Sequence, residues 1–312
     1  MQTILRVMPA RIKEGLQKLS AQQISLLQEI RLRRQQPLLL KIGNSEWGLS
    51  AKGTCKVEES YVISQKELVD ILHAMSGFSL YAIEDELKQG YLTLEGGHRV
   101  GLTGKAVLEN DQIKTLKYMN GMNIRIAHEV IGCSERVMPY LVSNQKVYHT
   151  LIISPPGCGK TTLLRDIIRQ LSDGYHGYGP YTVSVVDERS EIAACYEGMP
   201  QKNVGKRTDV LDGCPKAEGM RMLLRAMGPE VVAVDEIGKA EDCTALREML
   251  GAGVAIICTV HGKDETECLR RPSLKEMLSE GLFERIIILS HRHGPGSIEA
   301  ILDGTRQMKV LA

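Results

Sequence analysis

The sequence predicts an α/β protein in which a mainly parallel sheet occupies the second half of the chain and a smaller α+β domain precedes it. After residue 150, short apolar runs rich in β-branched residues alternate with amphipathic helical patterns, as is typical of a parallel sheet covered on both faces. Before residue 135, helical patterns are followed by short strands separated by Gly and Asn-Asp turns. We therefore expect two domains, residues 1–135 and 136–312.

The composition is that of an ordinary globular chain with an aliphatic core. Of its 312 residues, 43% are hydrophobic and 25% are charged, but only 4% are aromatic. The formal net charge of +1 is too small to indicate nucleic-acid binding, and no such partner is expected. The eight cysteines lack C-x-x-C and zinc-ligand spacing, which favours a reducing cytoplasm. No apolar run approaches the ~18 residues of a membrane helix, so no direct membrane insertion is expected.

The chain begins with helical patterns. Apolar residues at helical spacing predict one or two amphipathic helices over residues 9–34, which end in the basic run 31–34 before Pro37. Two short strands are expected next, over residues 38–42 and 47–49, around a Gly-Asn turn.

A second helical region precedes a series of strands. Ser64 and Glu67 form a capping-box pattern that opens a helix ending at Met75, and a further helix is expected over residues 79–88. Short strands are then expected over 91–94, 98–102, 105–108, 113–117 and 122–126. A helix near residues 134–142 leads into the second domain.

Apolar runs mark the core strands of the second domain. They occupy residues 151–153, 182–186, 231–234, 254–260 and 286–289, with a last strand over 298–302. The helices between them fit right-handed crossovers. The longest stretch without an assigned element is 198–215, and a loop of that length is more often functional than idle.

The most specific motif lies between the first of these strands and the next helix. A tight Gly/Pro-rich loop over residues 154–159 leads to Lys160, which opens a helix with one apolar face. This is the layout of a P-loop, in which backbone N–H groups and a helix N-terminus hold phosphate. Lys160 can neutralise the β- and γ-phosphates, and the Thr161 hydroxyl can ligate Mg²⁺. The candidates for binding the nucleotide are Ser154, Pro155, Pro156, Gly157, Cys158, Gly159, Lys160, Thr161 and Thr162.

Two residues of this loop lead to separate predictions. Ser154 stands at the first Gly position of the motif, and because a Cβ makes positive φ costly by ~1–2 kcal/mol, we expect its φ to be negative. Cys158 lies beside Lys160 and a helix N-terminus, which favour the thiolate, so we expect its alkylation to block ATP binding. A small buried filler is the alternative for Cys158, and an ordinary Gly-rich turn is the alternative for the loop.

Two carboxylates follow the strand 231–234. The carboxyl ends of parallel strands meet at the sheet edge where the P-loop opens, so Asp235 and Glu236 are expected there. Asp235 would hold Mg²⁺, and Glu236 would orient and deprotonate the attacking water. Acidic turn residues without a catalytic function are the alternative.

Two other strands end in polar residues of the same kind. Asp187 and Glu188 follow the strand 182–186, and we expect them in the network around Mg²⁺ and water, although acids also favour helix N-termini. Thr259 and His261 end a further strand, where His261 can sense the γ-phosphate through a hydrogen bond. A structural histidine is the equal alternative.

Arginines outside the core are candidates for an arginine finger, which stabilises charge on a transferred phosphoryl group. Arg99 is displayed by a Gly-rich turn, and Arg125 lies in a strand of the same domain. Arg207, in the long loop, is equally open. For each of them, a solvated surface position is the alternative.

These motifs resemble those of the hexameric ATPases of type II and type IV secretion and pilus machines. In that family a Walker A loop, an Asp box, a Walker B strand and a His box occur in this order. The matching segments here are 154–162, 187–188, 235–236 and 259–261. Segments 207–219 and 235–238 are similar, more specifically, to the sporulation members of the group in endospore-forming bacteria.

The resemblance implies a RecA-like P-loop ATPase that uses ATP and Mg²⁺ and assembles with itself as a hexameric ring. It implies a cytoplasmic protein in the mother cell, recruited by a membrane-embedded protein of a sporulation channel or secretion complex. The residues that it places in catalysis are Lys160, Asp187, Glu188, Glu236, His261, Arg99 and Arg125, and those on the metal are Thr161 and Asp235. Arg99 and Arg125 fall where the family has arginines in its N-terminal domain.

Two other functions stay open. A nucleic-acid-dependent ATPase or translocase on the same fold is supported by the basic cluster 31–34, while the scarcity of aromatic residues speaks against base stacking. A scaffold that binds ATP without turnover is the non-enzymatic alternative, and the presence of Glu236 speaks against it.

Overall fold

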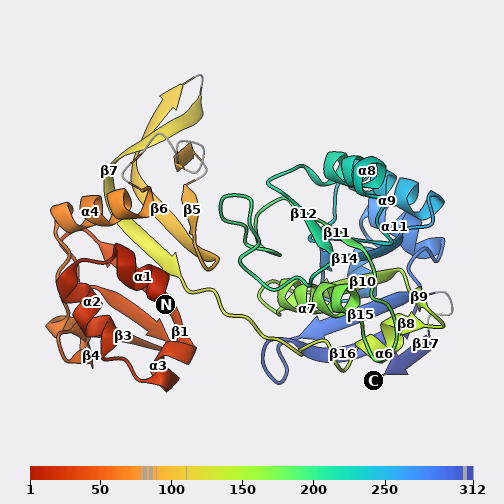
Figure 1. Cartoon of the computed structure of the whole chain (residues 1–312), viewed down its shortest axis with the longest axis horizontal. Coiled ribbons are helices and arrows are strands. Elements are labelled where there is room, and N and C mark those ends of the chain that lie inside the picture. The colour runs from red at the N-terminus through yellow and green to blue at the C-terminus, as the bar shows by residue number, and fades with distance from the viewer. Residues whose placement is uncertain are drawn as a thin grey trace. The chain divides into compact units, whose positions relative to one another are not determined.

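The structure, a computed structural model, describes residues 1–77, 79, 83, 87–88, 90–109, 111–304 and 308–311. It divides the chain into two compact units, Met1–His128 and Glu129–Ala312 (Figure 1). The division falls after His128, whereas the sequence places the domain boundary after residue 135. Each unit has its own hydrophobic core, so each is described by itself.

The first unit is an antiparallel sheet with helices on one face. Its strands, in spatial order, are β4 (Gly53–Cys55), β3 (Ser45–Ser50), β2 (Leu39–Ile42), β1 (Leu27–Arg33), β7 (Gln112–Arg125), β6 (His98–Glu109) and β5 (Tyr91–Leu94). Its helices include α1 (Gln2–Val7), α2 (Ala10–Gln17), α3 (Ala21–Leu26), the 3-10 turn η1 (Val57–Glu59) and α4 (Gln65–Met75). The capping box expected at Ser64 is confirmed, because its side chain accepts the Glu67 N–H and the Glu67 carboxylate accepts the Ser64 N–H.

The helical prediction over residues 9–34 is wrong for its last part, which is strand β1. Leu27 and Ile30 are both buried three residues apart, a spacing that suggests a helix in the sequence. In the structure a register shift between Leu27 and Glu29 inserts one extra residue into the pairing with β2, so both side chains reach the core from a strand. A β-bulge has therefore produced the helical spacing.

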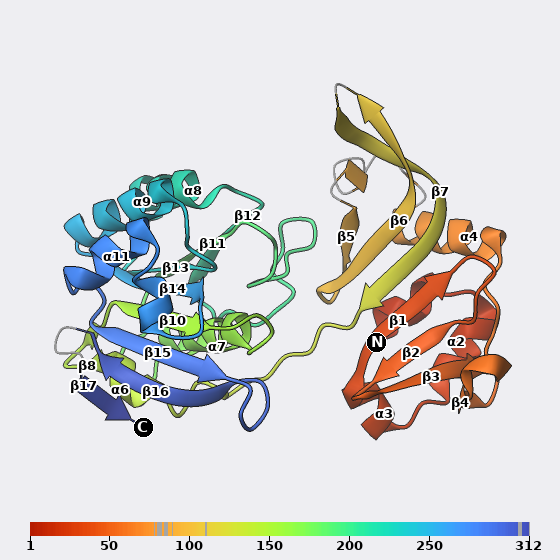
Figure 2. The ribbon, with the colours of Figure 1, turned by 180° about the vertical axis from the view of Figure 1, so that it is seen from behind.

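The later strands of this unit are longer than expected. The four short strands expected over residues 98–126 are two long ones, β6 and β7, which form a hairpin that extends beyond the rest of the sheet (Figure 2). Register shifts between Thr103 and Lys105 interrupt the pairing at the Gly that suggested a break. The helix expected over residues 79–88 lies largely outside the described residues.

The second unit is a mixed sheet with helices on both faces. Its main strands, in spatial order, are β12 (Thr208–Asp212), β11 (Val183–Asp187), β13 (Val231–Val234), β14 (Ala255–His261), β10 (Thr150–Ser154), β15 (Arg285–Ser290), β16 (Ser297–Asp303) and β17 (Met308–Leu311). The six strands from β12 through β15 in this spatial order run parallel, and β16 pairs antiparallel with β15 and with β17. All five expected parallel strands are present, and β12 is a sixth within the stretch 198–215.

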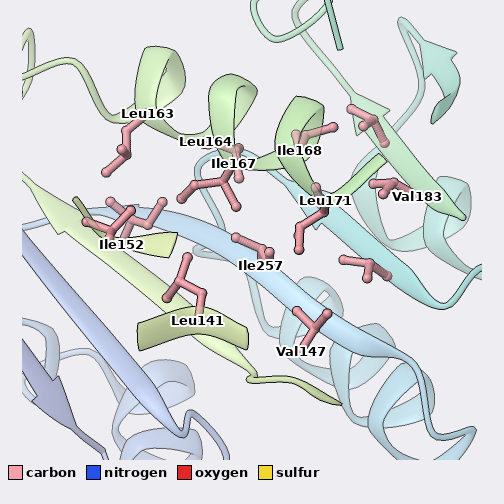
Figure 3. Packing of buried hydrophobic residues seen from close by; sticks show 14 of the residues in the cluster. Leu141, Val147, Ile152, Leu163, Leu164, Ile167, Ile168, Leu171, Val183 and Ile257 are labelled. Carbon is pink, nitrogen blue, oxygen red and sulfur yellow. The ribbon is translucent and has the colours of Figure 1, made fainter. Parts of the chain in front are cut away.

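Helices cover both faces of this sheet and divide its core into two clusters. The helices are α6 (Met138–Leu141), α7 (Lys160–Asp173), α8 (Lys216–Met227), α9 (Ala240–Gly251), α10 (Glu265–Cys268) and α11 (Pro272–Ser279), and a small hairpin of β8 (Val142–Ser143) and β9 (Lys146–Val147) follows α6. Figure 3 shows Leu164, Ile167 and Leu171 of α7 packed over Ile152 and Ile257 of the sheet. This packing fixes α7, and with it Lys160, at the end of β10.

Candidate functional site

The candidate site begins at the loop between β10 and α7. Ser154 is the last residue of β10 and has extended backbone, so the prediction of a negative φ is confirmed. The left-handed conformations fall on Gly157 (φ +75°) and Gly159 (φ +84°), where no Cβ is present. A Cβ at Gly159 would lie 3.3 Å from the backbone nitrogen of Gly296, so the loop after β15 packs closely against this turn.

The Lys160 side chain turns from the start of α7 toward the ends of the neighbouring strands. Its Nζ lies 2.9 Å from Glu236 Oε1 and 3.2 Å from His261 Nε2. His261 Nε2 in turn lies 2.6 Å from Glu236 Oε1, so the ring donates an N–H to this carboxylate. Ser154 is level with His261 in the pairing of β10 and β14, which explains why three segments far apart in sequence meet here.

A second group of contacts lies one residue further along α7. The Thr161 hydroxyl donates to Asp235 Oδ2 over 2.5 Å. The Thr259 hydroxyl donates to the other Asp235 oxygen and accepts the Glu236 N–H over 2.9 Å. Asp235 is 9% exposed and Thr259 is fully buried, so these bonds fix the orientation of the Asp235 carboxylate.

Glu236 sits in an uncommon backbone conformation. Its φ of +54° is left-handed, which costs free energy for a residue with a Cβ and persists only where the surroundings enforce it. The Thr259 bond to its N–H and ion pairs to Lys160 and Arg189 (3.1 Å) supply that enforcement. Burial alone would raise the pKa of Glu236, but Lys160 and His261 lower it, and the net pKa lies below its ordinary value.

Asp187, at the end of β11, is a buried acceptor for the turn that follows it. Its carboxylate accepts the N–H groups of Glu191, Ile192 and Ala193 over 2.8–2.9 Å. Burial raises the pKa of Asp187 to about 6, although these backbone donors act in the opposite direction. These hydrogen bonds order the turn that carries Arg189. Asp187 therefore affects Glu236 indirectly, through the position of Arg189.

Glu188 pairs with a lysine that the sequence did not single out. The Lys216 ammonium, at the start of α8, donates to the Glu188 carboxylate and lowers its pKa. Arg189 was missed for a similar reason: its importance depends on a contact with Glu236, 47 positions away. Both are ordinary basic residues in the sequence, and the only available signal was the position of Arg189 directly after the acidic pair.

The expectation of a reactive thiolate at Cys158 is wrong. The side chain is fully buried in the core under α7, and this burial raises the pKa of the thiol although Lys160 acts in the opposite direction. A buried thiol of raised pKa is unreactive. Cys158 therefore fills space beneath the loop, and its backbone oxygen accepts the Gly296 N–H over 2.8 Å.

The candidate arginines of the first unit lie together. Arg99 and Arg125 are partners across β6 and β7. The Arg99 guanidinium stacks 3.7 Å above the Tyr91 ring, whereas Arg125 is exposed and lies 3.8 Å from Glu29. In the second unit, Arg207 donates to the Ser172 carbonyl at the end of α7, which gives it a structural contact away from Lys160.

Thr161 and Asp235 provide the oxygen ligands that Mg²⁺ prefers. Mg²⁺ is usually held by one or two protein oxygens, with water and substrate phosphate completing its shell. The Thr161 hydroxyl and the Asp235 carboxylate already touch, so the donor set fits such an ion. Within the described ranges, no group of three or more His, Cys, Asp or Glu side chains forms a self-sufficient metal site.

Comparison with known proteins places this geometry in a family. The family model described as sporulation stage III, protein AA matches residues 1–309. The chain belongs to this family. Stage III sporulation protein AA of Bacillus subtilis (strain 168) is 44% identical to it over 304 residues, which are 97% of this chain and 95% of that protein. Protein SEEDLING PLASTID DEVELOPMENT 1 of Arabidopsis thaliana is 28% identical over 160 residues, 51% of this chain and 22% of that protein.

Solved structures show the same fold for this member of the sporulation stage III, protein AA family. The pilus retraction motor PilT, solved with bound ADP, has a TM-score of 0.58 at 15% identity and covers 85% of this chain and 75% of its own. The Legionella pneumophila ATPase DotB has a TM-score of 0.55 at 17% identity, with 84% and 72% covered. The fold is thus like that of PilT and DotB, mixed α/β with parallel strands. None of the helices in the described ranges is both long and apolar enough to span a bilayer.

Proposed function

We propose that this protein is an ATP hydrolase of the secretion and pilus motor type. The observation that carries the proposal is the meeting of Lys160, Glu236 and His261 at the carboxyl edge of the parallel sheet, within 3.2 Å of one another. A cation and a carboxylate beside a loop of phosphate-binding geometry are groups that γ-phosphate hydrolysis uses, and the imidazole is placed to form a hydrogen bond with either. Bound ADP in PilT and the name of the DotB ATPase support the choice of nucleotide.

In this proposal the polar groups exchange partners when ATP arrives. Lys160 leaves Glu236 and binds the β- and γ-phosphates, together with the backbone N–H groups of the loop. The Glu236 carboxylate is then free to accept a proton from water attacking the γ-phosphate in line. His261 donates a hydrogen bond to Glu236 in the structure. When ATP is bound, it either donates this bond to the γ-phosphate instead or keeps it and holds Glu236 in place.

Mg²⁺ would be held by Thr161 with Asp235, and it supplies charge neutralisation at the phosphates. Thr161 gives up its bond to Asp235 to do so, and Thr259 keeps the Asp235 carboxylate oriented meanwhile. Asp187 acts as a positioning residue through the turn 188–193, and Glu188 fixes the start of α8 through Lys216.

The biological role that we propose is that of a motor for a sporulation-specific channel or secretion complex between mother cell and forespore. Its membership in the sporulation stage III, protein AA family and the fold that it shares with the pilus retraction motor PilT and the ATPase DotB support this role. In this role the protein is cytoplasmic and forms a ring with copies of itself. A membrane-embedded partner recruits it to the membrane. Arg99 or Arg125 of one copy would serve the nucleotide of its neighbour.

ATP hydrolysis by the purified protein tests the proposal directly. Lys160→Ala should abolish both nucleotide binding and turnover. Glu236→Gln should lower kcat by at least about 10²-fold, the usual contribution of a general base, while ATP still binds. Glu241→Gln is a matched control, because Glu241 is an exposed carboxylate in the first turn of α9. Unchanged turnover in Glu236→Gln would remove Glu236 from its role, and an inactive wild type that binds ATP would favour a scaffold.

A further inference from the structure

The first unit carries a large polar hollow, and the ATPase proposal gives no role to most of the residues that line it. Its volume is about 740 Å³, within the usual range of ligand sites. Residues of strands β1, β7 and β6 line it. These strands are neighbours in the interior of the sheet (Figure 1). Four arginines line it: Arg31, Arg33, Arg34 and Arg125.

Strand alternation explains why the arginines gather there. Ile30 and Leu32 of β1 are fully buried in the core of the unit, so Arg31 and Arg33 between and beyond them lie on the opposite face. That face bears Asn123 beside Arg31 and Gly121 beside Arg33 in the register of β1 and β7. The helices therefore cover one face of the sheet, and the arginines stand on the other.

Glycines leave the backbone of the strands accessible on this face, because they have no side chain. Gly101 is paired with Asn123, and a Cβ at Gly101 would meet nothing closer than the Asn123 oxygen at 4.0 Å. A glycine in a strand interior weakens the strand, and it often marks a place where a ligand approaches the backbone. Gly90, Gly101 and Gly121 all line the hollow. The space is thus open at Gly90 and Gly101, whereas the Thr103 hydroxyl lies close to Gly121.

The charge of the hollow is only partly neutralised. Arg31 pairs with Glu29 at 2.6 Å, and Arg125 lies 3.8 Å from the same residue. Arg33 and Arg34 are exposed, and within the described part of the chain neither forms an ion pair. Guanidinium groups without counter-ions suit an anionic ligand.

The strands and residues that line the hollow favour one class of anionic ligand over another. An extended peptide usually pairs with a free strand edge, but β1, β7 and β6 are interior strands. Among the described residues that line the hollow none is aromatic, and contacts to a phosphodiester backbone do not require one. Arg31 and Arg33 are two residues apart on one strand, about 6.7 Å, which matches successive phosphates of an extended single strand. Guanidinium groups bind phosphate oxygens in pairs.

We propose that this hollow binds single-stranded nucleic acid through its phosphodiester backbone. The low net charge of the whole chain does not oppose this, because only the local cluster meets the ligand. Contacts to phosphate without stacking bind with little sequence preference and with strong salt dependence. Arg33 and Arg34 have no role in the proposed ATP hydrolysis, so binding through these two residues is tested independently of turnover.

Fluorescence anisotropy of a dye-labelled oligodeoxythymidine, measured over a range of salt, tests this site in the full-length protein. The variant Arg33→Ala/Arg34→Ala should bind at least tenfold more weakly at low salt. The slope of log K against log salt should fall by about 1.4, because each phosphate contact contributes about 0.7 for a single strand. Arg31 and Arg125 are left intact, since Glu29 pairs with both and Arg125 is a candidate for nucleotide contact.

The matched control removes the same charge from the helical side of the same unit. Lys13→Ala/Lys66→Ala changes two exposed lysines on α2 and α4, and it should keep the affinity and the slope of the wild type. Arg33→Lys/Arg34→Lys should keep most of the slope. Equal loss in the control and the arginine variant would overturn the proposal. So would displacement of the oligonucleotide by polyglutamate at equal charge concentration, since that result would assign the hollow to acidic peptides.

Discussion

Thr259 shows how one buried side chain organises the acidic residues of the site. Its hydroxyl bonds to Asp235 and to the Glu236 N–H, so it sets the direction of one carboxylate and the backbone of the next residue. Valine has nearly the same shape but lacks both bonds. A residue with no proposed contact to the nucleotide therefore controls two residues that are proposed to act on it.

We predict that Thr259→Val lowers kcat at least about tenfold and destabilises the protein by about 1–3 kcal/mol, the cost of leaving buried polar groups unpaired. KM for ATP should change less than kcat, because Lys160 and the loop are untouched. Steady-state kinetics and urea denaturation measure the two effects. Thr259→Ser keeps the hydroxyl and should restore most of the turnover, whereas equal damage from serine and valine would show that only packing matters.

Among single residues, the sequence allows us to predict the positions of those that lie at the carboxyl ends of parallel strands. Lys160, Glu236 and His261 could be placed together because parallel strands bring their carboxyl ends to one edge. The contact of Arg189 with Glu236 could not, because it depends on a turn held by Asp187. The buried state of Cys158 could not either, since burial decided the pKa of a thiol that its sequence neighbours made look reactive.

Among the elements, α7 holds the segment that leads into the second unit. The Asp166 carboxylate, on α7, accepts the N–H groups of Gly132 and Ser134 and the Ser134 hydroxyl, and it also pairs with Arg169. Hydrogen bonds therefore hold residues 129–135 against the helix that begins with Lys160. This explains why the second unit starts at Glu129, before the boundary that composition suggests.

We predict that Asp166→Asn destabilises the second unit by about 2 kcal/mol at pH 7. Burial would raise the pKa of Asp166, but bonds from Ser134, Gly132 and Arg169 outweigh it and lower the pKa to about 2. A lowered pKa stabilises the fold above the ordinary value of 3.8, and this contribution is lost as pH falls toward 2. Urea denaturation of wild type and variant should thus converge between pH 4 and pH 2.

The control for this measurement is Asp173→Asn, an exposed carboxylate on the same helix with a single backbone bond, to Lys206. Its effect should stay within about 0.5 kcal/mol. A difference between wild type and Asp166→Asn that does not change with pH would show that the negative charge of Asp166 contributes nothing.

Helices and strands with a consistent apolar or capping pattern could be predicted from the sequence. Strands whose form depends on how they pair with neighbouring strands could not. The buried parallel strands and the capped helix at Ser64 need only local information. Strand β1 needs its partners β2 and β7, because its bulge gives Leu27 and Ile30 the spacing of a helix. Strand β12 has mostly half-buried or exposed residues and carries little apolar pattern at all.

For the whole molecule, the decisive prediction concerns sites shared between copies. If Arg125 serves the nucleotide of a neighbouring copy, Lys160→Ala and Arg125→Ala proteins should each be inactive alone. Mixed in equal amounts, they should recover about one quarter of wild-type turnover, since half of the loops and half of the neighbouring arginines are intact. ATP hydrolysis after mixing and re-equilibration measures this.

A mixture of Lys160→Ala and Glu236→Gln is the control, because both residues act in the same site of the same copy. This mixture should recover nothing. A lack of recovery in the arginine mixture, together with a monomer in analytical ultracentrifugation with ATP, would exclude the shared site.

The ion pair between Lys160 and Glu236 has a consequence for the strength of the proposed ATP binding. Without ATP, the positive charge of the loop is already compensated inside the protein. The affinity for ATP would therefore be the difference between two electrostatic attractions of Lys160, one to the phosphates and one to Glu236. In the proposed reaction, release of ADP and phosphate restores the internal ion pair, so the carboxylate that is proposed to activate water would also favour the escape of product.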